Sequence, residues 1–233
     1  MILNIHGYQG SSKNTMFQIL EELFPDQVLV SPQLNYDEAS PFEIIKTLET
    51  KVSLCPEATE SVHSDHRDET QLIVGTSLGG FFATSLWAKF KTVPTILFNP
   101  AFTPWTIQPI VERYSSKAEE YKSIHDEAHR NPGSIDNLHI ILGNHDEVLG
   151  NVSDTIIFSL VEFCQRDEVS VNGIAIAKGL SKPINIRKIE CGHSAVGDHI
   201  AIAQIKETIK TLASNGFSNS RAVRSKKGCY FGD

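Results

Sequence analysis

The stretch LIVGTSLGGFFATSLW, residues 72–87, decides the fold. It opens with an apolar run typical of a buried strand, turns through Thr76-Ser77-Leu78, and continues as an apolar stretch of helical length. Glycines flank the turn, where a strand that passes directly into a helix must run close to neighbouring backbone. We therefore predict a strand, a sharp turn at Ser77 and a helix.

The same alternation of short apolar strands with amphipathic segments continues along the chain. Strands are predicted at residues 1–5, 27–30, 71–75, 94–98, 138–142 and 184–189, and helices at 14–24, from Ser40 onward, and at 78–90, 153–164 and 198–213. Alternation of this kind indicates parallel βαβ units, and near-continuous apolar strands are typical of a sheet that is covered on both faces. We predict one doubly wound α/β domain over residues 1–215, with a mostly parallel sheet of about six strands between two helical layers.

Three stretches do not fit the alternation. Residues 55–70 are polar and predict a solvated loop, and residues 99–137 carry aromatic and proline residues at one end and charges at the other. Residues 216–233 have the composition of a loop, so we expect a flexible C-terminal tail.

Composition narrows the classes of function. The 233 residues are 40% hydrophobic and carry a formal net charge of −7, which disfavours nucleic acid as a partner because phosphate binding depends on clustered Lys and Arg. No stretch is apolar enough to span a bilayer, and the first residues lack the pattern of a signal peptide, so we expect none. The four cysteines lie far apart and form no CxxC pair. We expect a cytoplasmic protein that binds neither membrane nor nucleic acid.

Residues 75–79 read Gly-Thr-Ser-Leu-Gly and match the G-x-S-x-G nucleophile elbow. In such an elbow the strand-to-helix turn holds the serine in a strained conformation and exposes its hydroxyl at the carboxyl edge of the sheet. The strand before the motif and the helix after it supply the context that the motif requires. Ser77 is therefore a candidate nucleophile.

A serine hydroxyl needs a base to take its proton, and in this kind of fold an acid and then a histidine follow in later loops. Asp146 follows the strand at 138–142, and His193 follows the strand at 184–189, so we predict Asp146 as acid and His193 as base. Glu147 remains the alternative acid, and His199, inside the last predicted helix, the alternative base.

Two backbone N–H groups are needed to stabilise the oxyanion. We assign them to Leu78, directly after the serine, and to Tyr8 in the loop after the first strand, with Gly7 as the alternative to Tyr8. Phe102 and Trp105 could form one wall of a substrate pocket, or could equally pack the following helix onto the sheet.

These residues resemble those of the α/β-hydrolase superfamily, and more closely the small bacterial esterases of the YqiA type (UPF0227). The resemblance rests on four stretches in the right order: LNIHGYQGSS, LIVGTSLGGFFAT, LFNPAFTPW and GNHDEVL. It implies Ser77 as nucleophile, Asp146 as acid and His193 as base, in an enzyme that hydrolyses carboxylic esters or thioesters without a cofactor. Compared with that family, residues 167–183 look like an inserted loop or hairpin.

We therefore predict a serine esterase for short to medium acyl groups, with a small-molecule ester or thioester as substrate. An acyl-CoA thioesterase or another acyl hydrolase is the alternative within enzymes, and a binding protein on a hydrolase scaffold is the alternative outside them. No metal site is predicted, because the His63-Asp65-His66 and Asp198-His199 groups each lack the ligands of a closed site.

Overall fold

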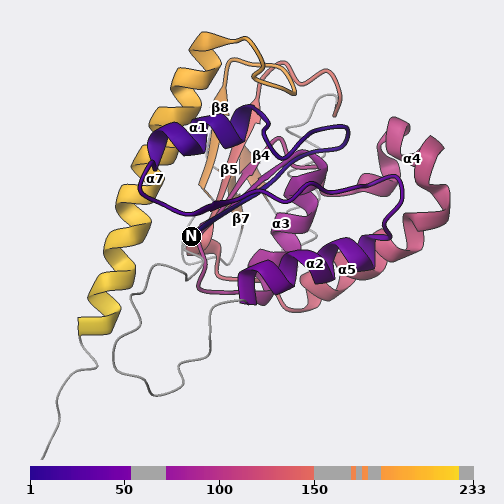
Figure 1. Cartoon of the computed structure of the whole chain (residues 1–233), viewed down its shortest axis with the longest axis horizontal. Helices are drawn as coiled ribbons and strands as arrows, with labels where there is room; N and C mark the ends of the chain where they lie inside the picture. Colours follow the sequence, from indigo (N-terminus) through magenta and orange to yellow (C-terminus); the bar gives the residue numbers. More distant parts are fainter. Residues whose placement is uncertain (54–71, 150–168, 172–174, 178–184, 226–233) are drawn as a thin grey trace, which may run out of the picture.

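The computed structural model describes residues 1–53, 72–149, 169–171, 175–177 and 185–225, and its centre is a parallel sheet of six strands (Figure 1). In spatial order the strands are β2 (Leu29–Val30), β1 (Ile2–Ile5), β3 (Leu72–Thr76), β4 (Thr95–Phe98), β5 (Leu138–Gly143) and β8 (Asn185–Ile189). The predicted strands and the doubly wound α/β arrangement are thus confirmed.

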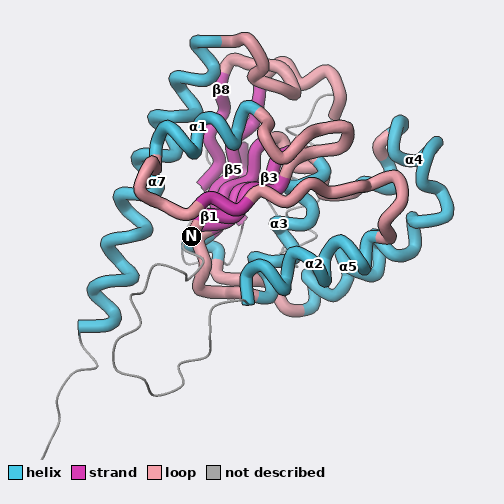
Figure 2. The backbone as a smooth tube through the Cα atoms, viewed as in Figure 1, coloured by secondary structure: helices cyan, strands magenta, loops and turns pink. Residues whose placement is uncertain are grey.

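Helices cover both faces of this sheet (Figure 2). One face carries α1 (Thr15–Leu23) and α7 (His199–Ser225), and the other carries α2 (Pro41–Ser53), α3 (Leu78–Lys89) and α5 (Ala118–Arg130). Successive strand residues point to opposite faces. Ile2 accordingly packs in the apolar cluster of α1 and α7, whereas Leu3 packs in that of α2, α3 and α5.

The order of the strands determines where a site can form. β1 lies between β2 and β3, so the direction in which strands are added to the sheet reverses at β1. Ligands of open α/β sheets bind at such a reversal, outside the carboxyl ends of the strands. The loop that follows β1 and the turn that follows β3 meet at this position.

Residues 99–137 are largely helical, which the sequence interpretation missed. They contain the short helix α4 (Gln108–Tyr114), the longer α5 and three turns of 3₁₀ helix: η2 (Pro104–Thr106), η3 (Ser115–Lys117) and η4 (Ile135–Asn137). The buried face of α5 consists of Tyr121, Ile124 and Ala128, in a helix otherwise rich in charge. These three residues recur at helical spacing, but so narrow a stripe is easily overlooked.

The last helix also differs from the prediction. α7 continues to Ser225, so residues 216–225 are helical and not part of a loop-like tail. The Ser, Asn and Gly residues there have weak helix propensity, but extending an existing helix by such residues costs at most about 1 kcal/mol each, and no proline interrupts the helix. Figure 1 shows this half of α7 extending away from the sheet.

Between β5 and β8 the chain forms the antiparallel pair β6 (Val169–Val171) and β7 (Ala175–Ala177), as the hairpin alternative for residues 167–183 predicted. The loop predicted at 55–70 and the helix predicted at 153–164 lie outside the described residues. Within the described chain, no helix has the length and apolar character needed to cross a membrane.

Candidate active site

Ser77 occupies a sharp turn between β3 and α3. Its backbone has φ 53° and ψ −121°, a left-handed conformation that is unusual for a residue with a side chain. Backbone hydrogen bonds fix the turn on one side: the Ser77 N–H donates to the Phe98 carbonyl over 3.0 Å, and the Ala101 N–H donates to the Ser77 carbonyl over 3.0 Å. The strain expected of a nucleophile elbow is therefore present at Ser77.

Close backbone approach explains the glycines around this turn. A Cβ atom on Gly75 would lie 2.5 Å from the Cβ of Ala83, and one on Gly79 would overlap the Ile5 carbonyl oxygen. A Cβ atom on Gly80 would lie 2.7 Å from the Cβ of Pro100. Any side chain at these positions would push the first turn of α3 away from the sheet.

The side chains of Ser77, His193 and Asp146 form one hydrogen-bonded chain. His193 Nε2 lies 2.8 Å from Ser77 Oγ, and His193 Nδ1 lies 2.7 Å from Asp146 Oδ2. Because a carboxylate can only accept, Nδ1 carries the proton and Nε2 is left to accept from the Ser77 hydroxyl. This tautomer is the one in which a histidine can take a proton from a serine.

Asp146 is held rigidly. Its carboxylate is fully buried, and its second oxygen, Oδ1, accepts from the N–H groups of Val148 over 3.0 Å and Leu149 over 2.8 Å. The alternative acid, Glu147, is exposed, and its Oε2 accepts from the backbone N–H of His193 over 3.1 Å. Backbone hydrogen bonds, from its own N–H and then from that of His193, lower the pKa of Glu147. Glu147 therefore binds the main chain of the histidine, whereas Asp146 binds the imidazole.

The loop after β1 passes directly over the serine. A Cβ atom on Gly7 would lie 2.9 Å from the Cβ of Ser77. Leu78 is the first residue of α3, and N–H groups in the first turn of a helix have no partner within the helix. Leu78 and the residue after Gly7, Tyr8, thus both lie next to Ser77.

Buried His6 fixes the start of this loop. His6 Nδ1 is 2.8 Å from the Gly7 carbonyl, and His6 Nε2 accepts from the Leu34 N–H over 2.9 Å. Burial lowers the pKa of His6, against a smaller opposing effect of the hydrogen bond to Gly7. A neutral ring with its proton on Nδ1 satisfies both contacts, whereas a protonated ring would direct a second N–H at the Leu34 N–H.

Because the pKa of His6 is lowered in the folded state, the protein should become less stable as the pH is lowered. The unfolded chain binds the proton at about pH 6.5, and the folded state binds it only at lower pH. Stability is thus lost from about pH 6.5 downward, through the folded-state pKa of His6. Urea unfolding at about pH 7.5 and about pH 5.5 should give a smaller difference for His6→Gln than for the wild type. An unchanged difference would contradict this role of His6.

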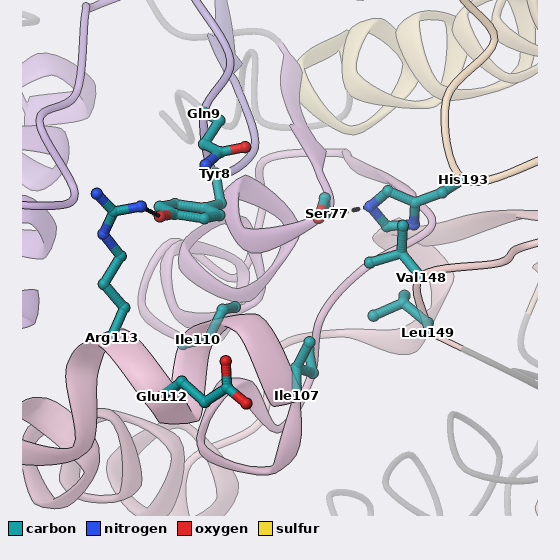
Figure 3. Close-up of a pocket in the computed structure, with 10 residues that line it drawn as sticks. All are labelled: Tyr8, Gln9, Ser77, Ile107, Ile110, Glu112, Arg113, Val148, Leu149 and His193. Atoms are coloured by element: carbon teal, nitrogen blue, oxygen red, sulfur yellow. Dashed lines mark hydrogen bonds between the residues drawn. The ribbon is translucent and has the colours of Figure 1, made fainter.

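Two cavities meet at the serine. The first has a volume of about 590 Å³ and is drawn in Figure 3, where Ile107 and Ile110 face it from the α4 side and Val148 and Leu149 lie beside His193. The second has a volume of about 480 Å³ and extends toward α1 and the loop after His193. Both cavities include four residues in their linings: Tyr8, Gln9, Ser77 and His193. A group bound to Ser77 Oγ would have space on either side.

The far end of the first cavity is polar. Arg113 donates from Nη1 to the Tyr8 hydroxyl over 3.0 Å (Figure 3). Its Nε lies 3.3 Å from Asp37 Oδ1. The cavity is therefore apolar at Ile107 and Ile110 and charged where Glu112 and Arg113 of α4 line it. In the described part of the chain, no three His, Cys, Asp or Glu side chains gather as metal ligands.

The comparisons with known proteins agree with this architecture. The sequence model of the family described as "Uncharacterised protein family (UPF0227)" matches residues 1–164. The chain belongs to the UPF0227 family. Its match covers the strands and turns that carry Ser77 and Asp146, and the family predicted from the sequence is confirmed.

Solved structures similar to this UPF0227 chain have the α/β-hydrolase fold. Est1E from Butyrivibrio proteoclasticus has a TM-score of 0.58 at 13% identity, with 93% of this chain and 88% of that chain covered. S-formylglutathione hydrolase (FrmB) from Staphylococcus aureus has a TM-score of 0.55 at 14% identity, with 91% and 80% covered. Alpha/beta hydrolase domain-containing protein 10 from mouse has a TM-score of 0.54 at 14% identity, with 92% and 89% covered. The predicted fold is confirmed by this likeness.

Phe102 and Trp105 lie away from the cavity at Ser77. Phe102 is buried in the core of the α3 face, and Trp105 packs against that core with its ring 5.2 Å from His125 of α5. Neither is among the residues that line the two cavities. In this UPF0227 chain one wall of the first cavity is formed by Ile107 and Ile110 instead. The sequence interpretation missed these two residues because it gave no bounds to the helix that follows Trp105.

Cys191, two residues before His193, is buried, and its thiol is free. Burial, aided by the nearby carboxylates of which Asp198 contributes most, raises the pKa of the thiol to about 11. At about pH 8, iodoacetamide should therefore modify Cys191 about 100-fold more slowly in the native protein than in urea, because the thiolate is the reactive form. Peptide mapping by mass spectrometry measures both rates, and comparable rates would contradict the burial of this thiol.

Proposed function

We propose that this UPF0227 protein is a serine hydrolase that cleaves carboxylic esters through an acyl-enzyme. The hydrogen-bonded chain from Ser77 Oγ through His193 to Asp146 is the observation that carries the proposal. The fold adds support, since a strained serine after β3 and a histidine after the last strand are how α/β-hydrolases arrange acyl transfer. The printed names of Est1E and of S-formylglutathione hydrolase fit the same class of reaction.

In the first step, His193 Nε2 accepts the hydroxyl proton while Ser77 Oγ attacks the carbonyl carbon. Asp146 keeps the imidazole in the required tautomer and stabilises its positive charge. The negative charge on the carbonyl oxygen is stabilised by the N–H groups of Leu78 and Tyr8. The C–O bond to the alcohol then breaks, and His193 gives its proton to the departing oxygen.

In the second step, water replaces the alcohol. His193 removes a proton from water, the hydroxide oxygen attacks the acyl carbon, and the carboxylic acid leaves as Ser77 Oγ recovers its proton. No cofactor takes part in this scheme. The two cavities that meet at Ser77 suit a substrate with one substituent on each side of the reacting carbonyl group.

Reaction with a fluorophosphonate probe tests the proposal, because only an activated serine attacks the phosphorus and displaces fluoride. The wild-type protein should be labelled at Ser77 and should hydrolyse chromogenic esters in a panel of graded acyl length. Thioesters of the same acyl groups, run alongside, decide between ester and thioester preference. Absence of both labelling and hydrolysis would favour a binding protein on a hydrolase scaffold.

We place the acyl group of the substrate in the first cavity, which has the apolar residues Ile107 and Ile110 in its lining. Ile110 should therefore limit the length of the acyl chain that the enzyme accepts. Ile110 is buried, and phenylalanine in its place would fill space along the apolar wall. Losing room for two methylene groups costs about 1.6 kcal/mol, or roughly 15-fold in kcat/KM for an octanoyl relative to an acetyl ester.

Trp105→Phe is the matched control for Ile110→Phe, since Trp105 packs beside α5 and outside the cavity lining. It should leave the acyl-length preference unchanged. If Ile110→Phe and the wild type show the same acyl-length preference, the acyl group binds instead in the second cavity, which extends toward α1.

A further inference from the structure

Asn99, the residue directly after β4, is fully buried and has a φ of 42°. Asparagine tolerates this left-handed conformation better than most residues, yet a fully buried amide still needs partners for all its polar atoms. The position thus combines backbone strain with a polar side chain that cannot reach solvent. Such a combination persists only where surrounding contacts hold it.

The amide of Asn99 joins two loops of the site. Its Oδ1 accepts from the Gly143 N–H at the end of β5 over 2.7 Å. Its Nδ2 donates to the carbonyls of Gly192 over 3.1 Å and His193 over 3.0 Å. One side chain therefore connects the strand that precedes Asp146 to the backbone of the histidine itself.

The same short segment holds the serine. The carbonyl of Phe98 accepts from the Ser77 N–H, and the N–H of Ala101 donates to the Ser77 carbonyl. Ser77 follows β3 and His193 follows β8, and the strands β4 and β5 lie between them in the sheet. Residues 98–101 thus contact the main chain of both residues, which are not on neighbouring strands.

We propose that Asn99 is a positioning residue that sets the distance between Ser77 Oγ and His193 Nε2. It touches neither of these atoms and acts by fixing the His193 loop against the segment that fixes Ser77. Glu147 holds the N–H of the same histidine, but from an exposed position, so the buried amide of Asn99 provides the firmer of the two contacts. This inference rests on the proposed function.

Two substitutions separate the amide from the backbone strain. Asn99→Gly removes the side chain and tolerates φ of 42°. Asn99→Asp keeps the shape and an acceptor for the Gly143 N–H, but has no N–H group for the two carbonyls. Each variant should lower kcat for a chromogenic butyryl ester by about 10- to 100-fold, since a displacement near 1 Å costs up to about 100-fold. KM should stay within about two-fold, because the cavity lining is unchanged.

Thr95→Val is the matched control. Thr95 is also fully buried, but it lies at the start of β4, the strand that Asn99 follows, and its hydroxyl donates to the Val93 carbonyl. This variant should lose stability and keep kcat. The rate of labelling by a fluorophosphonate, measured per folded molecule by near-ultraviolet circular dichroism, should fall with kcat in the Asn99 variants and remain unchanged in Thr95→Val.

The outcomes distinguish the inference from the proposed function. Folded Asn99 variants with kcat and labelling rate within about two-fold of wild type would overturn the positioning role and leave the proposed function standing. Failure of both variants to fold would also overturn it, because Asn99 would then serve the stability of the fold. A wild-type protein that neither hydrolyses the ester nor reacts with the probe would overturn the proposed function itself.

Discussion

Replacing Ser77 by alanine is expected to lower kcat for ester hydrolysis by about 10⁶-fold, close to the effect of removing a whole Ser-His-Asp triad elsewhere. The reason is that the Ser77 hydroxyl is the group that His193 Nε2 contacts. Labelling by a fluorophosphonate should also be lost. If Ser77→Ala still hydrolyses a chromogenic butyryl ester, Ser77 is not the nucleophile.

Ser77→Gly is the informative companion of this variant. It removes the same hydroxyl and also relieves the left-handed conformation at φ 53°, which costs a residue with a Cβ atom about 1–2 kcal/mol. We expect this variant to be inactive and to unfold at higher urea concentration than Ser77→Ala. Equal midpoints for the two variants would mean that the turn stores no strain.

The second large effect is expected for Asp146→Asn, which should lower kcat by about 10⁴-fold with the fold intact. An asparagine amide can donate to His193 Nδ1, which moves the ring proton to Nε2 and leaves no acceptor for the Ser77 hydroxyl. Loss of kcat at nearly unchanged KM, with a native circular dichroism spectrum, is the expected result.

Glu147→Gln supplies the control for Asp146→Asn. The substituted amide keeps an oxygen that can accept from the His193 N–H, and the side chain is exposed. We expect kcat to change by less than about three-fold. If Glu147→Gln lowered kcat more than Asp146→Asn, Glu147 would be the acid, which is the alternative that the sequence left open.

The parts of the fold that could be predicted are those with local causes. A turn at Ser77 needs glycines at fixed positions, and Gly75, Gly79 and Gly80 all lie within contact of other backbone or side-chain atoms. Loops after parallel strands meet at one edge of the sheet, so the approach of Asp146 to His193 could be predicted from the place of each residue after a strand. The helix predicted from Ser40 onward has a local cause too, because Ser40 and Glu43 have the spacing of a capping box, and the structure contains both of its hydrogen bonds.

The parts that could not be predicted depend on contacts between distant segments. Asn99 lies 94 residues before His193, and nothing in the letters around it indicates that its amide reaches the His193 carbonyl. The apolar wall at Ile107 and Ile110 follows from α4, a helix too short for a periodic signal. For Asn99, the sequence shows only that an amide directly after a buried strand must find partners, without showing which ones.

The pairing of β5 with β8 has a consequence for how this protein can change. Gly143 pairs with Ile189, so the carboxyl ends of the two strands lie side by side, and Asp146 and His193 follow within four residues of them. The contact between Asp146 and His193 thus depends on strand register and is independent of how many residues connect the strands. That connection is consequently a region where insertions can be gained or lost in evolution, or a new segment grafted by design, while Asp146 and His193 keep their places.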